Sequence, residues 1–284
     1  MQKLNFLTAG MPNRTQPRTY KNALNDLAAM NLDGLELEFV RGVTINAQNQ
    51  ALVKQMSAEL GMAITAHAPY YINLNAQEQD KYYASIKRIL DTARACHACG
   101  GYSITFHAAF YMGQDKNEVQ KKVTTALKGI IQDLKSENID IWIRPELTGK
   151  EAQWGDLDEL IQLSKDVEMV LPCVDFAHLH ARTVGKWNTY DEFCRVFEKI
   201  GNELGNVALE NFHAHIAGIE YTQKGERRHL NLEESDMDYK NLMRAFRDFN
   251  IKGVIICESP SIEDDAILLR DTYKSLCTET LKTL

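Results

Sequence analysis

The chain has 284 residues, of which 44% are hydrophobic and 25% charged, and its formal net charge is −7. This composition is ordinary for a globular protein, and a chain of this length can bury a substantial core without disulfides. Six cysteines scattered through core-like segments indicate reduced thiols and not a disulfide framework. No segment reaches the roughly 18 apolar residues that a membrane span needs, and the N-terminus lacks a signal-peptide layout. We therefore expect a cytoplasmic protein with no membrane partner.

Short apolar or β-branched segments alternate with longer amphipathic segments along the whole chain. Strands are predicted at 4–10, 34–39, 62–68, 103–108, 139–146, 170–176, 207–216 and 252–259. Helices are predicted at 17–31, 46–60, 76–99, 115–137, 155–166, 189–203, 238–250 and 262–280. This strict alternation indicates an α/β fold, and the count of eight favours a closed (β/α)8 TIM barrel over an open, doubly wound sheet. We expect a single domain over residues 1–284, with a long loop at 217–237.

Histidines and acidic residues gather where the predicted strands end. The strand-end residues are His67, His107, His213, His215, Glu146, Asp175 and Glu258, and the loops after the sixth and seventh strands carry His178, His180 and His229. Barrel enzymes place their chemistry at the carboxyl ends of the strands, where side chains converge. One such histidine is more often a structural residue than a ligand, but a set this large is hard to bury without partners. Imidazole and carboxylate ligands suit zinc, manganese or iron, and their number fits two or three ions.

Other sequence motifs give little support to different chemistry. The CxxC spacing of Cys96 and Cys99 lies within a predicted helix and has no second pair, so buried core thiols are the better interpretation. The chain contains no GxGxxG, P-loop or GxSxG motif. Nucleotide-cofactor and serine-hydrolase functions therefore have no support in the sequence.

At its strand-end residues the sequence resembles the endonuclease IV family, the metal-dependent apurinic/apyrimidinic endonucleases among the xylose-isomerase-like barrels. The resemblance runs over nearly the whole chain. Its most specific elements are the string H-x-x-Y-x-I-N-L from His67 to Leu74 and the D-x-x-H pair of Asp175 and His178. Shorter matching segments include PELTG at 145–149 and ICESP at 256–260.

Carried over residue by residue, the resemblance implies a zinc centre of two or three ions, with manganese as another suitable metal. The implied ligands are His67 and His107 for the first ion, Glu146 as a bridge, Asp175, His215 and Glu258 for the second ion, and His178 and His229 for the third. Glu146 and Glu258 are the implied catalytic residues. Family members carry an aspartate two residues before the last histidine, where this chain has Arg227. The third ion is then held by Glu226 after a local shift of the chain, held weakly, or absent.

The resemblance also implies a DNA substrate. It predicts hydrolysis of the phosphodiester 5′ to abasic sites in damaged double-stranded DNA, as in base excision repair, by a monomer. Arg41, Tyr70 and Tyr71 stand at the positions that probe bent DNA through the minor groove. Two aromatic residues beside a metal ligand can act as a wedge that replaces a stacked base. The alternative is that one of the tyrosines packs beneath its own loop.

Two other functions remain open at this point. A sugar isomerase or epimerase of the same superfamily, with one divalent metal, would need only Glu146, Asp175, His215 and Glu258. The surplus histidines favour the nuclease, whereas the net charge of −7 and Arg227 favour the sugar enzyme. A degenerate, non-catalytic barrel that binds damaged DNA or a protein would carry an incomplete ligand set, whereas the set here is nearly full.

Overall fold

The structure is a computed structural model that describes residues 2–282. Eight parallel strands form its main sheet, in the order β6-β4-β3-β2-β1-β12-β9-β8. These strands are β1 (Leu4–Ala9), β2 (Gly34–Glu38), β3 (Ala63–His67), β4 (Ser103–Phe106), β6 (Trp142–Pro145), β8 (Val174–Asp175), β9 (Phe212–Ile216) and β12 (Gly253–Cys257). Parallel bridges from Ile143 to Val170 and from Glu146 to Cys173 join the two ends of this order. The sheet therefore curls on itself, which confirms the predicted TIM barrel.

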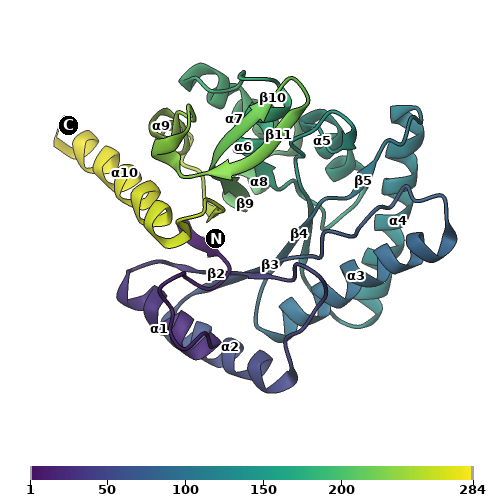
Figure 1. The fold of residues 1–284 in the computed structure, drawn as a ribbon, viewed down its shortest axis with the longest axis horizontal. Helices are drawn as coiled ribbons and strands as arrows, with labels where there is room; N and C mark the ends of the chain where they lie inside the picture. Colours follow the sequence, from purple (N-terminus) through teal and green to yellow (C-terminus); the bar gives the residue numbers. More distant parts are fainter. Residues whose placement is uncertain (1, 283–284) are drawn as a thin grey trace.

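Helices cover the outside of the curled sheet (Figure 1). They are α1 (Tyr20–Ala29), α2 (Ala47–Leu60), α3 (Gln79–Ala98), α4 (Lys116–Ser136), α5 (Leu157–Asp166), α6 (Phe176–Arg182), α7 (Tyr190–Leu204), α8 (Asn206–Glu210), α9 (Tyr239–Asp248) and α10 (Ile262–Lys282). Their starts follow familiar local rules: Asp156 and Glu159 form a capping box at α5, for example. No helix within residues 2–282 is long and apolar enough to cross a membrane.

The inner face of the barrel is polar toward one end, because strand residues alternate between the two faces. On β2, Leu35 and Leu37 join the large apolar cluster between sheet and helices, whereas Glu36 contacts side chains of other strands inside the barrel. Apolar inner residues, such as Leu7 and Ile256, form a small cluster of their own on β1 and β12. The polar inner residues thus lie mainly on the strands that end in histidines or acids.

Three segments differ from the sequence prediction. The strand expected at 170–176 is reduced to β8, and α6 follows it at once because the Asp175 carboxylate caps the helix by accepting from the His178 amide at 2.6 Å. His178 and His180 therefore lie on a helix, and their placement in a loop was wrong. The first part of the strand expected at 207–216 is the helix α8, and β9 begins only at Phe212. Periodicity alone cannot assign so short an apolar run to helix or strand.

The predicted loop at 217–237 is largely a β-hairpin, which is the third difference. Its strands are β10 (Gly218–Thr222) and β11 (Gly225–Leu230), and a 3-10 turn, η1 (Leu232–Glu234), follows. In Figure 1 the hairpin lies beside α6, which it also contacts. A second small pair joins β5 (Ala109–Phe110) to β7 (Gln153–Trp154). His229 thus lies on β11 and not in a loop.

Candidate metal centre

A ring of ionisable side chains lies at the carboxyl ends of the barrel strands. We call it the upper ring; its members are Glu38, His67, His107, Glu146, Asp175, His215 and Glu258. Strand register sets the ring, since Glu38 pairs with His67 and Asp175 with His215 in adjacent parallel strands. Parallel strands bring their carboxyl ends to the same end of a barrel. The structure therefore brings together every strand-end residue that the sequence indicated as a ligand, and adds Glu38.

The first cluster consists of His67, His107 and Glu146. The Nε2 atom of His67 lies 3.1 Å from Oε2 of Glu146, and Nε2 of His107 lies 3.1 Å from Oε1 of the same carboxylate. One ligand atom from each residue lies within 4.8 Å of the others. The Nδ1 atom of His67 lies 2.7 Å from the Ala68 carbonyl oxygen, which fixes the ring with Nε2 turned toward the cluster.

The second cluster shares Glu146 and adds Asp175, His215 and Glu258, again within 4.8 Å. The Nδ1 atom of His215 lies 3.2 Å from Oε1 of Glu258 and 3.7 Å from Oε1 of Glu146. Glu146 is 1% exposed, so its two oxygens are directed at neighbouring ligands and not at solvent. A carboxylate in this position can bridge two ions.

The third cluster joins Asp175 and His178 to His229 on the hairpin. The Nδ1 atom of His178 lies 3.1 Å from Oδ2 of Asp175, and its Nε2 atom lies 3.6 Å from Oε2 of Glu226. Glu226 is thus the hairpin acid that faces His178. Arg227 points away and pairs at 2.5 Å with Glu220.

A β-bulge explains why Glu226 and not residue 227 faces the cluster. In the hairpin Glu220 lies opposite Arg228 and Tyr221 opposite Glu226, so Arg227 is the extra residue. A bulge reverses the alternation of faces beyond it. Consequently Arg227 and Arg228 both reach Glu220, while Glu226 turns inward with His229.

Burial and mutual charge shift the pKa values of the ring in opposite directions. Burial opposes protonation of His67, but the contact with Glu146 and the nearby carboxylates outweigh it and raise the pKa of His67 to about 10. Burial, aided by the charges of neighbouring carboxylates, raises the pKa of Glu38 to about 8 and that of Asp175 to about 6. For Glu258, burial is outweighed by His215, which lowers the pKa to about 2. Such divergent shifts are typical of functional sites.

The donor atoms of the upper ring and of the third cluster fit divalent metal ions. Among the described residues, Oδ2 of Asp175, Nδ1 of His215 and Nε2 of His229 are buried without a hydrogen-bond partner of good geometry. Buried polar atoms rarely stay unpaired without a reason. Their mixture of imidazole nitrogens and carboxylate oxygens suits zinc or manganese, and the clusters share residues as a multinuclear site requires.

The sequence prediction missed several polar residues close to this ring. Glu38 belongs to the ring, and Glu36 and Cys173 lie inside the barrel near His215. His213, which was predicted among the strand-end histidines, lies below the ring beside Glu36. The alternation in the segment LELEF was a usable signal, because it places both glutamates on one face of the predicted strand. Cys173 gave no signal, and burial raises the pKa of its thiol to about 12.

The residues predicted to contact DNA lie on the rim beside the first cluster. Arg41 is exposed, and Tyr70 and Tyr71 are 56% and 64% exposed in the loop after β3. The ring of Tyr70 lies 5.6 Å from that of His67, so the rim borders the cluster directly. The exposed Phe110 and Met112 line a cleft of about 640 Å³ together with both tyrosines. The tyrosines are therefore accessible, and neither is packed beneath its loop.

Comparison with known proteins agrees with this fold. The family model described as "Xylose isomerase-like TIM barrel" matches residues 24–276. An uncharacterized protein of Methanocaldococcus jannaschii is 39% identical over 271 residues, covering 95% of this chain and 97% of its own. A probable endonuclease 4 of Mycoplasma pneumoniae is 26% identical over 238 residues, covering 82% and 78%.

Among solved structures, endonuclease IV from Thermus thermophilus is similar with a TM-score of 0.73 at 16% identity, covering 98% of this chain and 99% of that one. A D-tagatose 3-epimerase-like protein gives a TM-score of 0.74 at 16% identity, with the same two coverages. These likenesses establish the shared barrel architecture but do not separate the two activities. The predicted resemblance to endonuclease IV proteins is confirmed at the level of homology, and the chain belongs to the xylose isomerase-like TIM barrel family.

Proposed function

We propose that the protein is a metal-dependent hydrolase that cleaves the phosphodiester 5′ to abasic sites in damaged double-stranded DNA. The observation that carries this proposal is the extent of the ligand set. A single-ion sugar enzyme needs only the second cluster, whereas this barrel also assembles His67 and His107 on one side and His178 and His229 on the other. Relatives named endonuclease 4 support the same substrate class.

Each cluster has a proposed role in holding metal. His67, His107 and Glu146 would hold one ion, Glu146 with Asp175, His215 and Glu258 a second, and His178, Glu226 and His229 a third. Bound zinc or manganese would supply Lewis-acid charge, which activates water and offsets the charge that develops on a phosphoryl group. The negative charge of the chain is partly concentrated in these ligands, so it does not argue strongly against a nucleic acid substrate.

The rim residues would bind and orient the DNA. An abasic nucleotide has little stacking or pairing to lose, so drawing it out of the helix costs less than flipping an intact one. Tyr70, which lies beside the first cluster, and its exposed neighbour Tyr71 would occupy the space left in the base stack. Arg88 donates to the Tyr71 carbonyl at 3.0 Å and holds this loop in place. Arg41 is exposed on the neighbouring loop, where it can meet backbone phosphates.

The test is incision of a labelled duplex that contains one abasic site. We expect the wild-type protein to cut 5′ to the site and the double variant Glu146→Gln/Glu258→Gln to lose incision and bound metal together. Glu263→Gln is the matched control, since it changes a buried carboxylate that accepts from the Asn13 and Arg14 amides, and it should keep both properties. Incision by the double variant, or an uncut duplex with metal-loaded wild-type protein, would contradict the proposal.

A sugar isomerase or epimerase with one metal is the second candidate function. The second cluster favours it, because Glu146, Asp175, His215 and Glu258 by themselves bring four ligand atoms within 4.8 Å of one another. If this function is correct, the protein converts ketohexoses, which chromatography would detect, and leaves abasic DNA intact. The two activities can therefore be compared on one preparation.

A further inference from the structure

A second polar layer lies inside the barrel beneath the upper ring. Arg144, Ser103, His213 and Glu36 form it, and each is at most 1% exposed. They come from β6, β4, β9 and β2, so the barrel's closure brings together strands that are not all neighbours. The layer meets the ring at His215, whose Nε2 atom lies 3.0 Å from Oε1 of Glu36.

Proton positions in this layer can be followed from Arg144, because a guanidinium has only donors. Its Nε donates to Oγ of Ser103 at 2.7 Å. The Ser103 hydroxyl can then donate its own proton to Nδ1 of His213, 3.3 Å away. With Nδ1 accepting, a neutral His213 carries its proton on Nε2.

Glu36 faces a hydroxyl donor and two imidazole rings. A carboxylate only accepts. Its Oε2 atom accepts from the Thr65 hydroxyl at 2.7 Å and lies 3.2 Å from Nε2 of His213. Its Oε1 atom faces His215. Two lone pairs at 3.0 Å would repel, so Nε2 of His215 must carry a proton, and the pair is held although its angle is not that of an ideal hydrogen bond.

We infer that Glu36 is a positioning residue that keeps the proton of His215 on Nε2 and directs Nδ1 toward Glu146 and Glu258, where Nδ1 would give up its own proton when metal binds. This inference rests on the proposed metal centre, in which Nδ1 of His215 would be the ligand atom of the second cluster. Histidine ligands commonly donate their second ring N–H to a carboxylate, which sets the tautomer and raises the affinity for metal. Glu36 contacts two histidines in this way, His215 and His213. The contacts from Arg144 through Ser103 to His213 fix the orientation of the Glu36 carboxylate.

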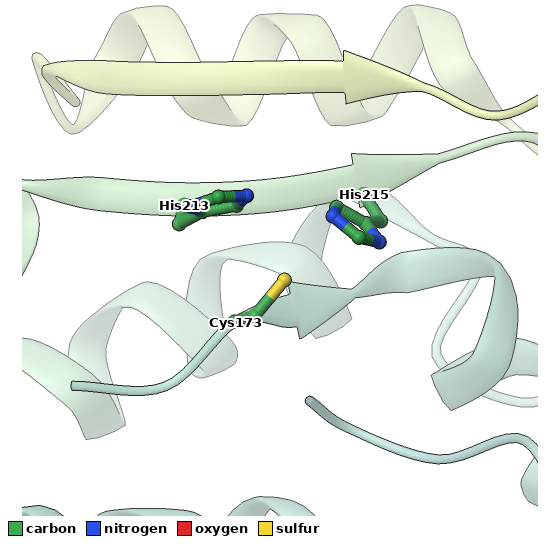
Figure 2. A group of neighbouring side chains, drawn as sticks. All are labelled: Cys173, His213 and His215. Atoms are coloured by element: carbon green, nitrogen blue, oxygen red, sulfur yellow. The ribbon is translucent and has the colours of Figure 1, made fainter. Parts of the chain in front are cut away.

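Another use of the same side chains would be a separate ion held by Cys173, His213 and His215. Figure 2 shows the three side chains together, with the Cys173 sulfur directed at the strand that carries both histidines. Their ligand atoms lie within 4.8 Å of one another. Glu36 already faces Nε2 of both histidines, however, and Nδ1 of His213 is engaged by Ser103. The contacts therefore favour the positioning role, and the experiment separates the two.

The direct test is nitrogen-15 NMR of the histidine side chains in the zinc-loaded wild-type protein. We expect the His215 signals, assigned by comparison with His215→Gln, to show a protonated Nε2 and an Nδ1 that binds zinc. A proton on Nδ1 with zinc on Nε2 would overturn the inference. Because this spectrum needs no variant of Glu36, it decides the matter even if such a variant does not fold. If the spectrum shows the expected His215 tautomer but the protein does not incise abasic DNA, the proposed function is wrong and the positioning role of Glu36 stands.

Variants give a second readout through zinc affinity, measured by competition with a chelator. Glu36→Gln should lower the affinity for one of the bound zinc ions by roughly 10–100-fold, because the single amide oxygen cannot accept from both histidines. The control Glu263→Gln, a buried carboxylate outside the barrel interior layer, should keep wild-type affinity. Cys173→Ala should keep every zinc equivalent. Unchanged affinity in Glu36→Gln, or loss of one equivalent in Cys173→Ala, would contradict the positioning role.

Discussion

One bulged residue decides which acidic side chain reaches the third cluster. The sequence alone did not show whether Glu226 or Arg227 lies on the same face as His229. Regular alternation along a strand would place residue 227 on that face. The bulge at Arg227 reverses this alternation and turns Glu226 toward His178. Bulges depend on pairing with the partner strand, so a single sequence offers little to predict them.

Replacement of these two neighbours should therefore have opposite outcomes. Glu226→Gln removes the carboxylate nearest His178 and should release the third ion, which elemental analysis after gel filtration would measure. Arg227→Gln alters a side chain that points outward to Glu220 and should leave the metal content unchanged. If Arg227→Gln lost metal while Glu226→Gln kept it, the assignment of the inward face would be wrong.

The raised pKa of His67 predicts how the metal-free protein responds to pH. Its pKa is about 10 in the fold against an ordinary 6.5, so the folded state binds the proton more tightly than the unfolded state. This contribution to stability is fully present below pH 6.5 and is lost as the pH rises through about 10. Urea denaturation of chelator-treated protein should show the free energy of unfolding falling across this window, and His67→Gln should flatten the slope. A slope unchanged in that variant would refute the assignment.

At the scale of elements, the β10–β11 hairpin carries His229 of the third cluster and the neighbouring Glu226, and close packing holds it in place. The Glu226 amide donates to the Gly149 carbonyl at 3.0 Å. A β-carbon at Gly149 would lie 2.7 Å from Cβ of Glu226 and 2.9 Å from Cδ2 of His178. On the partner strand Tyr221, opposite Glu226, donates to the Asp236 carboxylate, which His180 of α6 also contacts. The hairpin was expected to be a loop because β11 (GERRHL) is mostly charged and gives no apolar alternation.

Gly149→Ala should push the hairpin away from His178. Overpacking of this kind costs about 1–3 kcal/mol of unfolding free energy, and here it should also weaken the third ion. Gly129→Ala is the matched control, since this exposed position within α4 has no atom near a new β-carbon. It should stabilise the protein by roughly 0.5–1 kcal/mol without affecting metal. Denaturation and metal analysis of both variants would check this, and unaltered metal binding in Gly149→Ala would contradict the packing account.

For the whole molecule, the sequence predicted the barrel because the alternation of strands and helices is local and regular. It also predicted most of the upper ring, since strand ends converge in any such barrel. It could not predict that Glu36 meets His213 and His215, because β2 and β9 are separated by β1 and β12 in the sheet. Such contacts across the interior exist only after the barrel closes.

On the proposed function, the upper ring and the third cluster together hold several metal ions and not a single ion. Elemental analysis of protein purified without chelator tests it most directly. We predict about three zinc ions per chain, the number that the three clusters can hold with the usual imidazole and carboxylate ligands. About one ion per chain, especially manganese, would contradict the claim and favour a sugar isomerase or epimerase.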